Sequence, residues 1–380
     1  MESTWSRSSG EGSGEGSGGA ASSASLGEIM ERIRSDDREG RIEAAREIRR
    51  LTKTSSRHRR WLSGAVPPLV AMLRSGSEES AEAAILALLN LGVKDERNKI
   101  NIVEAGALEP IIHLLQSPNP DLQEYATAAV LTLTASSANK LAITTTGAIP
   151  LLVEVLKEGN AQAKADAVTA LYNLSTLPDN LKAILSAKAI PPLINLLRTI
   201  KKSSKTAEKC SALIEPLLNF EEGRNALINE EGGVLTVVEL LEEGSLQSKE
   251  HIVGALLTMC ESNRSKYREI ILKEGVIPGL LELTVKGTPN AQYKARKLLQ
   301  LLRDSPYPRS EFQADTIENI VSNIVAHIDR DDRAGKAKKM LAEMVQVSME
   351  QSLRHLQQRA LVCTPSEPPL SKCPSGVPFK

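Results

Sequence analysis

The 380-residue sequence is 41% hydrophobic and 25% charged, but only 3% of its residues are aromatic. Lysine plus arginine and aspartate plus glutamate each total 47, so the formal net charge is zero and no overall field attracts nucleic acid or an acidic membrane. No apolar run approaches the roughly 18 residues that a transmembrane helix needs, and the N-terminus lacks the apolar core of a signal peptide. The composition therefore predicts a soluble cytoplasmic or nuclear protein with an aliphatic, helical core.

The N-terminal segment divides into a low-complexity arm and a first helical region. Residues 1–25 are rich in Gly, Ser and Glu, with too few apolar side chains to offset the entropy of ordering, so we expect a disordered arm. Over residues 26–63 apolar residues return at helical spacing, which predicts a degenerate repeat or N-terminal cap. The basic run from Arg57 to Arg60 has two interpretations, a nuclear-localisation or phosphate-binding segment and an ordinary polar turn.

One sequence motif occurs six times within residues 64–303. Its best copies read glycine, alanine, an aliphatic residue and proline, and successive copies are 41 to 44 residues apart, the period of armadillo and HEAT repeats. The copies begin at Gly64, Gly106, Gly147, Lys188, Gly232 and Gly275. The glycine permits a positive φ where one helix ends, and the proline presets φ for the first turn of the next.

Each copy contains three predicted helices. A short helix precedes the motif, a second begins with it, and a polar turn leads to a longer third helix, as in 81–91, 123–133 and 163–174. These third helices are dense in alanine and leucine, and a helix that is apolar nearly all round must be buried between neighbours. Since no single copy can bury that surface, the copies must stack into an all-α solenoid. Pro216 falls inside the third helix of the fourth copy and predicts a kink there.

The repeat pattern stops after Leu302. A helical stripe follows at Ile317, Ile320, Val321, Ile324, Val325 and Ile328, and residues 340–356 form a second. We predict that residues 304–360 form a C-terminal helical cap, with a coiled-coil or partner-binding tail as the alternative. Residues 361–380 hold many prolines and are predicted to be disordered.

The motif, the Asn-Leu helix endings at Asn90 and Asn173, and the repeat period together resemble armadillo repeats. More narrowly, they are similar to the armadillo region of the plant U-box/armadillo ubiquitin ligases and their armadillo-only relatives. The resemblance covers about residues 40–303. It implies a right-handed superhelix of three-helix repeats whose concave groove binds another protein.

Two departures from related families bear on function. A U-box begins with Cys-Pro-Ile, but the chain's Cys-Pro at Cys373 leaves only seven residues and the N-terminal arm offers no room, so we expect no ubiquitin-ligase activity from this chain alone. In importin-α a tryptophan precedes each groove asparagine by one turn. The corresponding residues here are Leu86, Ala128, Thr169 and Gly254, so we do not expect binding of nuclear-localisation signals.

Two positions on the third helices are predicted to line the groove. The residues 26 positions after the start of the motif are Asn90, Thr132, Asn173 and Thr258. The residues 19 positions after it include Tyr125, Asp166 and His251. Amide and hydroxyl groups can bond the peptide groups of an extended partner, and the alternative is an ordinary solvated helix face.

The sequence contains no recognisable catalytic or metal-binding constellation. The five histidines lie far apart, and no phosphate-binding glycine loop or nucleophile elbow occurs. The cysteines Cys210, Cys260, Cys363 and Cys373 lack the spacing of a zinc or redox site, and the first two fill apolar positions of helices. We expect no enzymatic activity, cofactor, metal or small-molecule substrate.

The favoured function is a non-catalytic scaffold or adaptor in signalling that binds a partner protein or extended peptide in the concave groove. The alternative is a regulator or substrate adaptor in ubiquitination, related to the U-box/armadillo ligases. Nucleic-acid binding is disfavoured by the zero net charge and the few aromatic residues.

Overall fold

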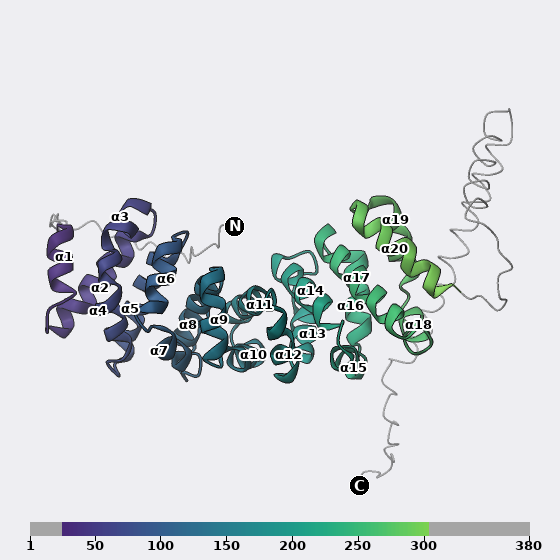
Figure 1. Cartoon of the computed structure of the whole chain (residues 1–380), viewed down its shortest axis with the longest axis horizontal. Coiled ribbons are helices and arrows are strands. Elements are labelled where there is room, and N and C mark those ends of the chain that lie inside the picture. The colour runs from purple at the N-terminus through teal and green to yellow at the C-terminus, as the bar shows by residue number, and fades with distance from the viewer. Residues whose placement is uncertain (1–24, 304–380) are drawn as a thin grey trace, which may run out of the picture. The chain divides into compact units, whose positions relative to one another are not determined.

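The computed structural model describes residues 25–303, which form helices and turns without any strand (Figure 1). They belong to two compact units, divided between Ala187 and Lys188. The predicted arm over residues 1–25 lies outside the described residues except for Ser25, which caps the first helix. The predicted cap over 304–360 and tail over 361–380 also lie outside them.

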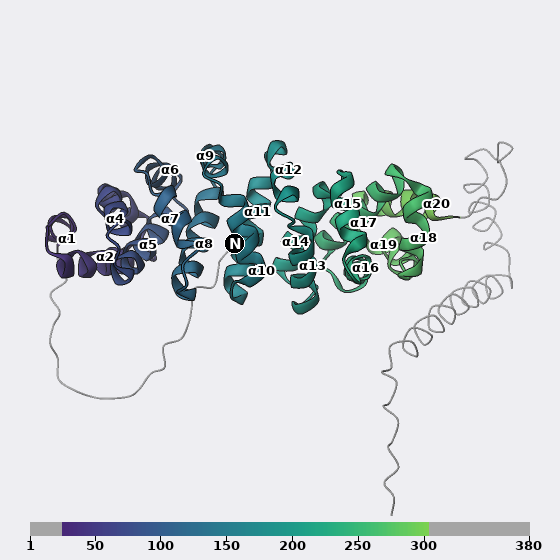
Figure 2. The same cartoon turned by 90° about the horizontal axis from the view of Figure 1, so that it is seen from below.

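Unit 1 begins with a helix pair, continues through three complete three-helix repeats and ends with the first helix of a fourth. The pair consists of α1 (Leu26–Arg32) and α2 (Arg38–Thr52), and α2 packs against α5 in the place of a preceding third helix. The first helices are α3 (Ser56–Trp61, continued by η1, Leu62–Ala65), α6 (Glu96–Glu104), α9 (Lys140–Thr145, preceded by η2, Ser137–Asn139) and α12 (Pro178–Ser186). The second helices are α4 (Val66–Leu73), α7 (Leu108–Leu114) and α10 (Ala148–Glu158), and the third are α5 (Glu78–Gly92), α8 (Pro120–Thr134) and α11 (Ala161–Ser175). Figure 2 places α6, α9 and α12 along one edge of this unit.

Unit 2 has the same order of helices. It opens with α13 (Ile190–Thr199) and α14 (Lys205–Leu217), the second and third helices of the fourth repeat. The fifth repeat consists of α15 (Glu221–Asn229), α16 (Gly233–Glu243) and α17 (Leu246–Ser262), and the sixth of α18 (Arg264–Lys273), α19 (Ile277–Lys286) and α20 (Pro289–Leu302). The three-helix repeat predicted from the sequence is confirmed in both units.

The third helices form the packed spine of each unit. In unit 1, α2 packs against α5, α5 against α8 and α8 against α11, and in unit 2 α14 packs against α17 and α17 against α20. Each third helix begins at a side chain that accepts a hydrogen bond from its first turn: Ser77, Asn119, Asn160, Ser204, Ser245 or Thr288. The polar turns read from the sequence are therefore helix caps.

The turn before each second helix mostly has the backbone that the motif predicts. Gly106, Gly147, Gly232 and Gly275 have φ between 62° and 79°. The expectation is wrong for Gly64, which lies in η1 without a positive φ. Lys188 replaces glycine in the fourth copy and adopts a φ of 59°. This left-handed conformation is energetically unfavourable for any residue that has a Cβ atom.

Pro216, where the sequence predicts a kink, is the penultimate residue of α14, which ends at Leu217. A proline there removes one N–H donor from the last turn, and the kink in the turn before it stays a prediction.

Cys210 of α14 and Cys260 of α17 are buried free thiols, as their apolar surroundings in the sequence indicate.

Buried asparagines tie the first helices to the ends of the third helices. Asn98 of α6 donates its amide to the backbone oxygens of Leu91 at 3.0 Å and Arg59 at 3.1 Å. Asn139 and Asn180, at the same position of the next two repeats, also donate to the C-terminal carbonyls of the preceding third helix. The last carbonyls of a helix lack the regular intrahelical partner, so the side-chain amides add hydrogen bonds at the buried ends of the third helices.

Candidate functional site

The predicted groove asparagines of unit 1 are each bonded to the preceding third helix. Asn90 of α5 donates its amide to the backbone oxygen of Arg49 in α2 at 2.8 Å. Asn173 of α11 donates to the hydroxyl oxygen of Thr134 in α8 at 3.2 Å. Both side chains are half-buried, and each bond uses one of the two N–H groups of an amide that also carries a carbonyl oxygen. The stack therefore orients both amides without using their full capacity to bond a peptide group.

The predicted groove threonines have a more restricted role. The Thr132 hydroxyl donates to the backbone oxygen of Ala128 one turn back, at 2.9 Å, so it can only accept from a partner. Its methyl group lies against α5, since a Cβ at Gly92 would be 3.2 Å from Thr132 Cγ2. Thr258 of α17 is half-buried in unit 2.

Asp166 of α11 is the most deeply buried of the predicted groove residues, with 8% of its surface exposed. Its Oδ1 accepts a hydrogen bond from the Gln162 amide at 3.0 Å, whereas Oδ2 is buried without a partner among the described residues. Burial raises the pKa of this carboxyl to about 6, the Gln162 bond opposes that shift, and the nearby charge of Glu124 adds to it.

Tyr125, one repeat before Asp166, lies in acidic surroundings. Burial raises the pKa of its phenol, and the charges of Glu82 and Asp121 raise it further. Glu124, beside Tyr125 on α8, accepts a hydrogen bond from the Asn160 amide at 2.7 Å at the start of α11. The early turns of α5 and α8 therefore carry three carboxylates near one half-buried aromatic ring, and Arg49 of α2 partly offsets their charge.

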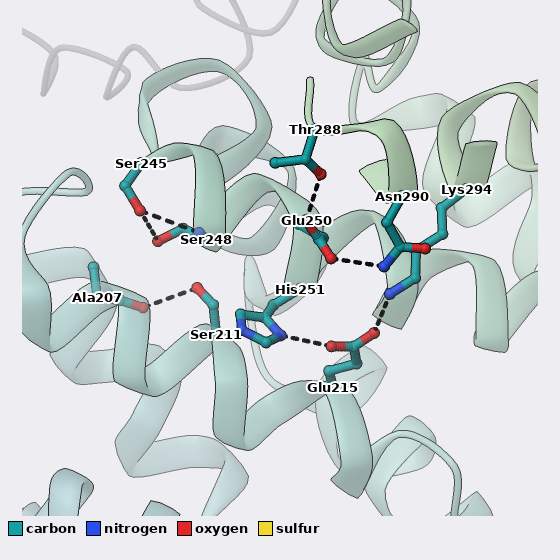
Figure 3. A network of polar contacts seen from close by, with 10 residues as sticks. All are labelled: Ala207, Ser211, Glu215, Ser245, Ser248, Glu250, His251, Thr288, Asn290 and Lys294. Carbon is teal, nitrogen blue, oxygen red and sulfur yellow. Dashed lines mark hydrogen bonds and ion pairs between the residues drawn. The ribbon is translucent and has the colours of Figure 1, made fainter. Parts of the chain in front are cut away.

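His251 in unit 2 belongs to a charged network across three third helices (Figure 3). Its Nδ1 lies 2.6 Å from Oε2 of Glu215 on α14, and Lys294 Nζ of α20 lies 2.8 Å from Oε1 of the same carboxylate. Since a carboxylate only accepts, His251 donates through Nδ1–H. Burial by itself raises the pKa of Glu215, but the bonds from His251 and Lys294 outweigh it and hold that pKa below its usual value.

A glycine in α17 makes room for this network. A Cβ at Gly254 would lie 1.9 Å from Glu215 Oε1 and 2.7 Å from Lys294 Nζ. Beside it, Glu250 of α17 accepts hydrogen bonds from Thr288 and Asn290 at the start of α20, and these two bonds lower its pKa. The face of α17 that contains His251 is therefore partly covered by side chains of α14 and α20, and His251 itself remains half-buried.

The seven predicted groove residues divide between the two units. Five lie on α5, α8 and α11 of unit 1, and His251 and Thr258 lie on α17 of unit 2. Sequence analysis missed Glu215 and Lys294, which are 79 residues apart. The one indication in the sequence was Gly254, because a glycine at a groove position leaves space that side chains of neighbouring helices can fill.

Two features that residues 25–303 lack bear on other classes of function. No helix in this range is long and apolar enough to cross a membrane. The same residues contain no group of three or more His, Cys, Asp or Glu side chains arranged to hold a metal ion.

Comparisons with known proteins agree with the repeat architecture. An engineered protein of solved structure superposes with a TM-score of 0.63 at 23% identity, over 81% of this chain and 75% of its own. U-box domain-containing protein 17 of Arabidopsis thaliana is 32% identical over 264 residues, which are 68% of this chain and 36% of that protein. U-box domain-containing protein 1 of Medicago truncatula is 38% identical over 263 residues, 68% of this chain and 38% of that protein.

The fold is thus that of an all-α armadillo repeat protein, as the sequence motif predicts. The family model described as the plant U-box protein ARM repeat region matches residues 25–319, and the chain belongs to that family. The chain spans little more than a third of the length of the two U-box domain-containing proteins.

Proposed function

We propose that this chain is a protein-binding scaffold whose third helices take up an extended segment of a partner protein. Membership of an armadillo repeat family supports this function, because stacked helical repeats expose long surfaces of regularly spaced side chains. The contact residues we propose are Asn90, Tyr125, Thr132, Asp166 and Asn173 in unit 1, and His251 and Thr258 in unit 2.

The observation that carries this proposal is the orientation of the two groove asparagines. Asn90 is held by Arg49 of the preceding third helix, and Asn173 by Thr134. An amide fixed in this way, with a carbonyl oxygen and an N–H still to offer, can pair with a peptide group without losing much side-chain entropy. The acidic surroundings of Tyr125 would select among partner side chains.

A protein fits this surface better than a nucleic acid. The formal net charge of the chain is zero, and the carboxylates near Tyr125 would repel phosphates. As a protein-binding scaffold, the chain would act in a signalling or regulatory assembly, and we propose the cytoplasm or nucleus as its location. Imaging of the tagged full chain in its native tissue tests that location.

The test is affinity purification of the full chain, followed by quantitative binding of each captured protein. We expect Asn90→Ala combined with Asn173→Ala to weaken binding of groove partners at least about tenfold, because the hydrogen bonds of two amides to the partner's peptide groups are lost. The matched control is Asn101→Ala with Asn229→Ala, which removes two exposed asparagines from first helices. Full binding of every partner by the groove variant would refute the proposal.

A second function is favoured by the family itself. The matched family is the armadillo region of U-box proteins, so we propose as the alternative that the chain regulates ubiquitination by binding the substrates of such proteins. The purified chain should form no ubiquitin chains with a conjugating enzyme alone. When titrated against a U-box protein that shares its partner, it should reduce ubiquitination of that partner, and an unchanged rate would exclude this role.

A further inference from the structure

The last described repeat exposes three large apolar side chains, whereas no other described repeat exposes more than two. Leu281 and Val285 of α19 are 50% and 76% exposed, and Tyr293 of α20 is 63% exposed. We call these three residues the end face. They belong to the second and third helices of one repeat, which pack against each other. Large apolar side chains with this exposure in one repeat indicate a surface that another element covers.

Equivalent positions in the other repeats show what kind of element covers the place that Leu281 occupies. Leu281 lies six residues after the start of its motif copy, and the same position in the other five copies is at most 8% exposed. Those five residues are Val70, Ile112, Val153, Ile194 and Val238. Within unit 2, α13 packs against α16 and α16 against α19, so each second helix is covered by the next. Leu281 therefore occupies the position that a following helix buries.

The geometry of α19 places two residues of the end face, Leu281 and Val285, away from α16. Gly279 faces α16, since a Cβ there would lie 3.0 Å from the Cβ of Leu241. At roughly 100° per residue, Leu281 and Val285 are rotated by about 200° and 240° from Gly279. Both residues thus lie on the side of α19 opposite to α16.

Tyr293 occupies a position that also contacts the next repeat elsewhere. Its equivalent in the preceding repeat is Glu250, which accepts hydrogen bonds from Thr288 and Asn290 of the following third helix. The sixth repeat has an aromatic ring where the fifth has a carboxylate. An aromatic ring at this position can pack against an apolar neighbouring element, whereas the carboxylate of Glu250 bonds the polar first residues of a helix.

The chain itself supplies a suitable neighbour directly after α20. The stripe from Ile317 to Ile328 repeats at intervals of three and four residues, the spacing of one apolar helix face. Thirteen residues, 304–316, separate it from Arg303, and a linker of that length spans up to about 43 Å when extended. The family match also continues to residue 319, beyond the last described repeat.

We propose that residues 317–328 form a helix that packs its apolar stripe against the end face of the same chain. This helix takes the place of a seventh repeat, as a terminal cap with a polar outer side is expected to do in a stacked array. The end face is then closed by the chain itself and is not a surface for partners, which bind elsewhere.

Disulfide trapping in the full chain tests this contact. In a background of Cys363→Ser and Cys373→Ser, which leaves the buried Cys210 and Cys260 in place, Val285→Cys is combined with Ile324→Cys and oxidised at low protein concentration. We expect an intrachain disulfide, identified by mass spectrometry. The matched control pairs Val285→Cys with Asn319→Cys, on the opposite side of the stripe, and should react at least tenfold less.

Two outcomes of this experiment would overturn the proposal. Equal trapping at residues 324 and 319 would show that the segment has no defined face toward α19. A disulfide that joins two chains would show that a second copy covers the end face instead.

Hydrogen exchange provides an independent test that needs no new covalent bond. Val285→Asp should reduce the protection of amides in 317–328 at least tenfold, because a charge at the centre of the end face disfavours apolar packing. Leu141→Asp is the matched control, since Leu141 is a comparably exposed residue of α9 in unit 1. Protection that is absent in the unsubstituted chain, or unchanged by Val285→Asp, would overturn the proposal.

Discussion

The buried carboxyl of Asp166 provides a prediction whose sign and size follow from the structure. Burial raises its pKa from 3.8 to about 6, with Glu124 of α8 adding to the shift and Gln162 of α11 opposing it. The folded state therefore holds the proton more tightly than the unfolded state. Stability is unaffected below the unfolded pKa and decreases as the pH rises from about 4 through about 6. A shift of about 2 pH units corresponds to a cost of about 3 kcal/mol at neutral pH.

Asp166→Asn removes this cost, because an amide is neutral at every pH and its oxygen can still accept from Gln162. We expect the difference in free energy of unfolding, variant minus unsubstituted chain, to rise by about 3 kcal/mol between pH 4 and pH 7. Urea unfolding followed by circular dichroism at several pH values measures this difference. Asp179→Asn on α12 is the control, since that residue is exposed. A difference that is flat or falls with pH would refute the reasoning.

Three further substitutions probe the contacts that hold the repeats together. Asn98→Ala should lower the free energy of unfolding by about 2–3 kcal/mol, since it removes two buried hydrogen bonds to backbone oxygens, and an unchanged urea midpoint would contradict this. Lys188→Gly should raise stability by about 1 kcal/mol by relieving a φ of 59°, and a lower melting temperature would contradict that account. Gly254→Ala should separate Glu215 from Lys294 and cost about 1 kcal/mol, which denaturant unfolding and the NMR signal of the Lys294 ammonium group would detect.

The repeat architecture could be predicted because its signals are local. The apolar run over 81–91 predicts a helix that the structure extends to Glu78–Gly92, and the three extra residues at its start form the first turn capped by Ser77. The motif glycines mark turns for the same local reason. Gly64 and Lys188 show the limit of this reasoning, because the backbone of each copy also depends on the helix that precedes it.

The candidate site could be placed on a helix face but not given its bonding partners. Counting residues from the motif puts Asn90 and His251 on the third helices, where the structure has them. It does not reveal that Asn90 is bonded to Arg49, or that His251 is bonded to Glu215. Those partners lie 41 and 36 residues away and meet only when whole repeats stack.

The sequence by itself determined the helical class, the repeat period and the helix faces, since a 3.6-residue periodicity and turn residues act over a few positions. Only the tertiary structure decided the environment of each side chain. Asp166 loses its water because α11 is packed among other helices, and Glu215 meets Lys294 because Gly254 lets them cross α17. Burial and ion pairing depend on atoms far apart in the chain, so no local pattern contains them.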